Sequence, residues 1–155
     1  MTDKQKILID ELINDLPDID KAVYKEIAEN ALNLGLKVTK TQRALSYTLN
    51  FSTKNQTIMR IGIDNDRQTE FKLKFYANKE YPQKFHDAVK ADYKDCYNCG
   101  KCERKNLRCY ITDVDGKTVR CGFELVNFGK NIITKDDIKE ISKLVSVQSK
   151  FAETF

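Results

Sequence analysis

The sequence lacks the features of a membrane or secreted protein. Nowhere do about 18 apolar residues run together, the length that a helix needs to cross a bilayer. Residues 1–16 carry a charge every few positions and contain no apolar core of the kind found in signal peptides. We therefore expect a cytoplasmic protein, in a compartment where cysteines stay reduced. The excess of lysine over arginine and the frequent asparagine and isoleucine are typical of an AT-rich bacterial genome.

Several catalytic classes also lack their usual residues. His86 is the only histidine, so the chain offers no histidine-rich arrangement for catalysis. No glycine-rich phosphate loop occurs, which speaks against nucleotide hydrolysis. The net charge of +4 comes from 27 basic residues interspersed with 23 acidic ones and not from a basic tail, as a nucleic-acid arm would require. These absences favour a binding or regulatory protein over an enzyme.

The remaining composition is that of an ordinary globular protein. The 155 residues are 41% hydrophobic and 32% charged. A chain of about 150 residues buries roughly 68–70% of its unfolded surface, which is enough for one substantial core. No repeat, linker or low-complexity tract divides the sequence. We expect a single α+β domain that spans residues 1–155.

Apolar residues at helical spacing predict helices near both ends of the chain. Residues 4–16 form a short amphipathic helix, and residues 18–35 form a second one that ends in a glycine. A third helix begins near Pro82. The last helix opens at Thr134, where Asp137 stands in a capping-box position.

The middle of the chain has the alternating pattern of strands. Three antiparallel strands are expected, with one face of their meander buried and the other wet. Farther along, Asp115-Gly116 predicts the turn of a C-terminal hairpin. The element order is then ααβββαββα, an antiparallel sheet with helices packed on one face and a cysteine-rich metal-binding segment between the third helix and the hairpin. The predicted strands cover residues 45–51, 59–63, 71–75, 107–114 and 117–128.

All five cysteines lie in one stretch, residues 96–122. Cys96-x-x-Cys99-Gly100 has the form of a zinc knuckle, in which two thiolates grip one ion from a tight turn. Cys102 adds a third thiolate at the same spacing. A fourth must come from the hairpin, from Cys109 or Cys121. We therefore predict a structural four-cysteine zinc site that fastens this stretch onto the sheet.

The register of the hairpin indicates which of the two remaining cysteines is the fourth zinc ligand. A two-residue turn at Asp115-Gly116 places Tyr110 opposite Cys121 and turns Cys109 to the other face, opposite Gly122. Cys109 then becomes the candidate reactive thiol, because arginines flank its position. A bulged turn would reverse this choice. The predicted zinc ligands are Cys96, Cys99, Cys102 and Cys121.

An iron–sulfur cluster is the alternative to zinc. The run Cys96-x-x-Cys99-x-x-Cys102 resembles the first three cluster ligands of bacterial ferredoxins, and the local NCGKC is similar to ferredoxin sequences. This resemblance implies a redox protein or sensor. The sequence departs from the ferredoxin pattern at Cys109, which follows after six residues instead of three and precedes tyrosine instead of proline. An iron assay combined with visible absorbance separates the two possibilities.

The wet face of the meander is the basis of a third hypothesis. By strand parity it carries Arg60, Lys72, Lys74 and Tyr76, and a basic sheet face with an aromatic residue can hold single-stranded nucleic acid by charge and stacking. Alternating lysines can equally serve only to keep the strands soluble. The sequence identifies no ligand, partner, pathway or oligomeric state.

Overall fold

The structure, a computed structural model, describes residues 2–54, 56–92, 109–111, 119–122, 124–129 and 132–154. Within these residues, four α-helices accompany a five-stranded antiparallel sheet and a separate two-stranded hairpin. The predicted α+β class is therefore confirmed. The order differs from the predicted one, because the described chain runs ααββββαβββα, with one additional strand before the meander and one after the hairpin.

The N-terminal helices α1 (Asp3–Asp15) and α2 (Asp18–Asn33) form a packed pair, as their apolar spacing predicts. A capping box between Thr2 and Gln5 closes the first turn of α1. After α2, Gly35 adopts a positive φ of 91°, which glycine reaches at little cost. The pair therefore begins and ends close to its predicted limits.

The main sheet has the strand order β1-β2-β3-β4-β7, and every neighbouring pair is antiparallel. Its central strands β2, β3 and β4 correspond to the predicted meander. The edge strand β1 was not predicted, because Val38 is its only apolar residue and the other five are exposed. The strands are β1 (Lys37–Gln42), β2 (Tyr47–Ser52), β3 (Thr57–Ile63), β4 (Thr69–Leu73) and β7 (Val126–Asn127).

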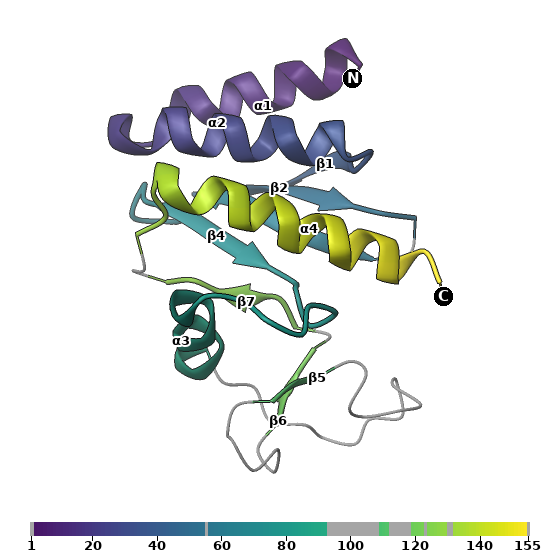
Figure 1. The fold of residues 1–155 in the computed structure, drawn as a ribbon. Coiled ribbons are helices and arrows are strands. Elements are labelled where there is room, and N and C mark those ends of the chain that lie inside the picture. Colours follow the sequence, from purple (N-terminus) through teal and green to yellow (C-terminus); the bar gives the residue numbers. More distant parts are fainter. Residues whose placement is uncertain are drawn as a thin grey trace.

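Cross-strand pairing divides the sheet into a buried face and an open face. On the buried face Phe51, Met59 and Leu73 align across three strands and are completely shielded from solvent. Helix α1 and the C-terminal helix α4 (Ile138–Ala152) contact this sheet, and α2 reaches it through Tyr24, whose ring lies 5.7 Å from that of Phe71. Figure 1 shows the three helices stacked on the same side. The open face carries polar residues such as Asn50, Arg60 and Lys72, which align across β2, β3 and β4.

Helix α4 (Ile138–Ala152) follows a short 3-10 turn, η2 (Lys135–Asp137). The predicted capping box is present there, since Thr134 and Asp137 bond each other's backbone and side-chain groups. Among the described helices, none has the length and apolar character needed to cross a membrane.

Helix α3 (Gln83–Ala91) packs against β7 at the edge of the main sheet. Beyond both lies the hairpin of β5 (Cys109–Ile111) and β6 (Val119–Cys121), at the end of the molecule away from α1 (Figure 1). The single strand predicted over residues 117–128 is thus divided in two. Its first part pairs with β5, and its second part joins the main sheet as β7.

Candidate functional site

The segment that holds all five cysteines leaves and rejoins the main body at one point. Asp92 ends α3, and its carboxylate accepts a hydrogen bond of 2.8 Å from the backbone N–H of Asn127 in β7. Residues 93–126, which we call the cysteine segment, therefore start and finish beside each other.

Tyr110 anchors the cysteine segment to the hydrophobic core. Its side chain is only 2% exposed, and its hydroxyl accepts a hydrogen bond of 2.8 Å from the backbone N–H of Phe75. The Tyr110 ring also lies 5.0 Å from the ring of Phe75 and 6.2 Å from that of Tyr76, both in edge-on geometry. Aromatic packing and a buried hydrogen bond together hold the hairpin against the chain that follows β4.

Three of the four predicted zinc ligands, Cys96, Cys99 and Cys102, lie outside the described residues. Cys121 is described and is half-buried. Within the described part of the chain, no three His, Cys, Asp or Glu side chains gather as a metal site. The zinc site and the iron–sulfur alternative both remain predictions.

The predicted register of the hairpin is wrong by one residue. The structure pairs Cys109 with Cys121 and Tyr110 with Arg120, instead of Tyr110 with Cys121. A two-residue turn requires an even number of residues between paired positions, whereas residues 112–118 between the paired Ile111 and Val119 are odd in number. The observed backbone register therefore does not assign Cys109 and Cys121 to opposite faces of the hairpin. The reason for preferring Cys121 over Cys109 as a ligand no longer holds.

Lys74 lies at the junction of the sheet and the hairpin, not on the open face as predicted. Strand β4 ends at Leu73, so the alternation of sides does not extend to Lys74, which is only 6% exposed. Burial and the positive charge of Arg60 lower the pKa of the Lys74 ammonium to about 8, whereas Glu124 and Cys121 act to raise it. The charge of Lys74 is therefore felt at the cysteine segment.

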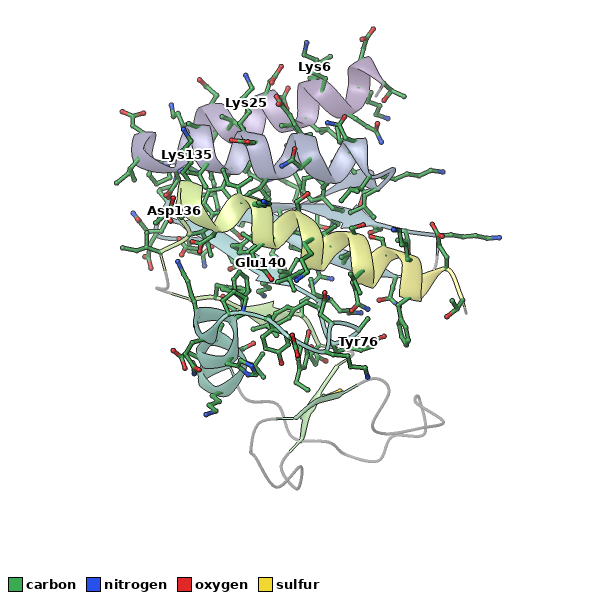
Figure 2. All side chains as sticks on the ribbon, in the orientation of Figure 1. Lys6, Lys25, Tyr76, Lys135, Asp136 and Glu140 are labelled. Atoms are coloured by element: carbon green, nitrogen blue, oxygen red, sulfur yellow. The ribbon has the colours of Figure 1, made fainter. Side chains whose placement is uncertain are left out.

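Tyr76 is also buried, with 7% of its surface exposed, and it is not available for stacking on a nucleic acid. Its ring packs edge-on against Tyr110 and against Phe151 of α4, at 5.6 Å from the latter. Figure 2 shows Tyr76 between the end of α4 and the hairpin. The alternation of sides fails for Tyr76 for the same reason as for Lys74, because both residues lie beyond the end of β4.

Arg60 and Lys72 do lie side by side on the open face, as predicted from strand parity. Arg60 donates from Nε to the side-chain oxygen of Asn50 at 3.0 Å, which orients its guanidinium, and Lys72 forms an ion pair of 3.4 Å with Glu70. These side chains line a cavity of about 440 Å³ together with Arg43. Sequence reasoning missed Asn50, although its polar position opposite Arg60 in β2 was a usable signal.

The described side chains thus form two separate features. One is the junction where Tyr110, Lys74 and the paired cysteine positions meet the sheet, and the other is the polar cavity on the open face. Comparison with known proteins finds no matching family model, no matching curated protein and no matching solved structure.

Proposed function

We propose that this chain is a small cytosolic, non-enzymatic binding or regulatory module, a single α+β domain with a structural four-cysteine zinc site. Cys96, Cys99 and Cys102 supply three thiolates. The fourth comes from the paired hairpin positions, and we retain Cys121 as that ligand with Cys109 as its alternative. The observation that carries the proposal is the closed base of the cysteine segment, which starts and ends at the Asp92–Asn127 hydrogen bond.

The size of the cysteine segment explains why it would need an ion. Below about 40 residues a chain cannot bury enough apolar surface to hold one conformation, and disulfides or metals usually supply the remaining stability. Residues 93–126 fall below this length and contribute one fully buried large side chain that the structure describes, Tyr110. A zinc ion bound only in the folded state stabilises such a segment directly.

The charges around the segment suit a thiolate site. Four thiolates and one divalent zinc leave a formal charge of about minus two, which neighbouring cations offset. Lys74 contributes a buried ammonium that interacts with Cys121. Additional cations occur within the segment itself, at Lys101, Arg104, Lys105 and Arg108.

Metal analysis of the full chain, purified without oxygen, tests the proposal. We expect one zinc per chain in the wild type and in C109S, and loss of zinc from C96S and C121S. C109S is the matched control for C121S, because the two positions face each other in the same hairpin. A protein purified without zinc, or a C96S variant that keeps it, would contradict the proposal.

The same preparation separates zinc from the iron–sulfur alternative. A cluster gives visible absorbance and iron in the metal analysis, whereas zinc is colourless and has no redox chemistry. Iron with the corresponding absorbance would replace the structural zinc module with a redox protein or sensor held by the same cysteine segment.

A second candidate function, the binding of nucleic acid or another polyanion, rests on the open face. There Asn50 holds Arg60 beside Lys72 in the cavity. Since Tyr76 is buried, such binding would depend on charge and not on stacking.

A titration with single-stranded oligonucleotide at increasing salt should show weaker binding for R60Q and K72Q. K25Q, which removes a charge from exposed α2, should bind as the wild type does (Figure 2). Equal affinities for all four proteins would exclude this function.

A further inference from the structure

The pairing of Cys109 with Cys121 places two of the five cysteines directly opposite each other on adjacent antiparallel strands. Directly opposed residues in such strands have Cα atoms about 4.5 or 5.5 Å apart, depending on whether the pair is hydrogen-bonded. Both distances fall within the roughly 4.4–6.8 Å that a disulfide spans. The backbone therefore satisfies the first requirement for a bond between these two residues.

The attachment of the hairpin to the core keeps these positions opposed. Tyr110, the neighbour of Cys109 in β5, is fixed by its hydrogen bond to Phe75 and by its ring contacts. None of these three contacts involves a cysteine. Cys121 is only half-buried, so a small oxidant has a path to it.

We propose that Cys109 and Cys121 form a reversible disulfide that withdraws the fourth thiolate from the metal site and releases the ion. The coupling to the ion rests on the proposed zinc function, whereas the disulfide rests on the hairpin register alone. In this proposal Cys109, which is not a zinc ligand, forms the disulfide with the ligand Cys121. A site with three remaining thiolates binds zinc more weakly than one with four.

The chemistry balances with hydrogen peroxide as the oxidant. One of the two sulfurs attacks a peroxide oxygen, the O–O bond breaks, and that cysteine becomes a sulfenic acid as the first water leaves. The second sulfur then attacks the first, the S–S bond forms, and the sulfenic oxygen leaves as the second water. The two cysteines lose two electrons and two protons, and one peroxide is reduced to two waters. A dithiol reductant reverses the change by thiol–disulfide exchange.

Peptide mapping of the full chain after peroxide treatment tests the proposal. Trypsin cuts after Arg108 and Arg120, so the two cysteines fall into separate peptides, 109–117 and 121–130. The other cysteines lie in peptides 95–101 and 102–104. We expect a disulfide-linked pair of peptides 109–117 and 121–130, the release of one zinc per linked chain to a colorimetric chelator, and recovery of both thiols and zinc binding after reduction.

Two variants separate the possible causes. C109S should form no such link and should keep its zinc at the same peroxide dose. C102S should still form the link, because the bond needs only the hairpin. If peroxide links other cysteines, or leaves these two peptides unlinked, the proposed disulfide is wrong. The zinc content measured before oxidation would still support the zinc function in that case. A link that forms without zinc release would overturn the coupling to the ion. A link in a protein that never contained metal would overturn the zinc function and leave the disulfide established.

Discussion

Tyr110 is the residue at which the cysteine segment meets the hydrophobic core. Phe75 and Tyr110 are both almost completely buried, so the hydrogen bond between the Phe75 N–H and the Tyr110 hydroxyl has no water to replace it. A buried donor that loses its acceptor costs more than the bond itself contributes. This hydrogen bond therefore stabilises the junction in addition to the ring contacts.

Removal of the Tyr110 hydroxyl provides the test at the residue scale. Tyr110→Phe keeps the ring contacts but leaves the Phe75 N–H unsatisfied, and we expect a loss of about 1–3 kcal/mol in the free energy of unfolding, measured with urea. Tyr81→Phe is the control. Its ring also packs on Phe75 at 5.0 Å, but its hydroxyl makes no hydrogen bond to the described residues. Equal stability of the two variants would show that ring packing alone holds the hairpin.

At the scale of elements, the start of α4 shows how a local sequence signal becomes a charged network. Asp137 accepts a hydrogen bond of 2.8 Å from the N–H of Thr134 and pairs with the Lys84 ammonium of α3 at 2.7 Å. Partial burial alone would raise the pKa of Asp137, but the bonds from Lys84 and Thr134 outweigh it and hold the pKa below its ordinary value of 3.8. One carboxylate thus ties two helices together.

This lowered pKa predicts the pH dependence of the network. A carboxyl group with a lower pKa in the folded protein stabilises it above pH 3.8, and this contribution disappears as the pH falls through the folded value. We expect Asp137→Asn to cost about 1 kcal/mol at neutral pH, as loss of a helix cap does. The difference from the wild type should narrow in acid.

Asp136→Asn is the matched control for this prediction. Asp136 is exposed beside Asp137 at the same helix start (Figure 2), and its replacement should stay within about 0.5 kcal/mol. Urea unfolding of the three proteins from neutral pH to pH 3 measures both effects. If the difference in unfolding free energy between the wild type and Asp137→Asn does not change with pH, the capping geometry and not the charge of Asp137 stabilises the helix start.

Elements with a clear apolar period could be predicted from the sequence, and those set by tertiary context could not. Helices α1, α2 and α4 and strands β2–β4 follow their periods closely. Strand β1 has only Val38 as an apolar residue, because a polar edge strand needs no buried face. Lys74 and Tyr76 were misplaced because parity holds only while a strand continues.

The candidate sites differ in the same way. The cysteine spacing and the neighbouring Arg60 and Lys72 could be recognised from the sequence, since both follow local patterns. The pairing of Cys109 with Cys121 depends on whether the number of residues between β5 and β6 is odd or even. An Asp-Gly turn signal does not determine that number. The Asp92–Asn127 contact joins α3 to β7, and no local pattern marks it.

At the scale of the whole molecule, we expect the sheet core and the cysteine segment to lose structure separately. The buried face of β2–β4 packs against α1, α2 and α4, whereas the segment touches the body through the Tyr110 junction and its closed base. Regions with few buried contacts open independently of a stable core. Loss of an ion should therefore loosen one part of the molecule.

Hydrogen exchange before and after chelation tests this separation. We expect peptides from residues 93–126 to lose protection when the ion is removed, while peptides from β2 and β3 keep theirs. The untreated protein with chelator replaced by buffer is the control. Unchanged exchange and melting would contradict a structural ion, and a loss of protection across the whole sheet would show that the segment and the core unfold together.

The meeting of the two ends of the cysteine segment has a consequence for engineering. Since Asp92 and Asn127 are already in contact, a short glycine-containing linker can replace everything between α3 and β7 without moving either element. The shortened protein would retain its three-helix layer and all five strands of the main sheet, but Phe75 and Tyr76 would lose their contacts with Tyr110. We expect the truncated protein to bind the excised segment when it is added back as a separate peptide. Tyr110 of that peptide would again pack on the exposed rings of Phe75 and Tyr76.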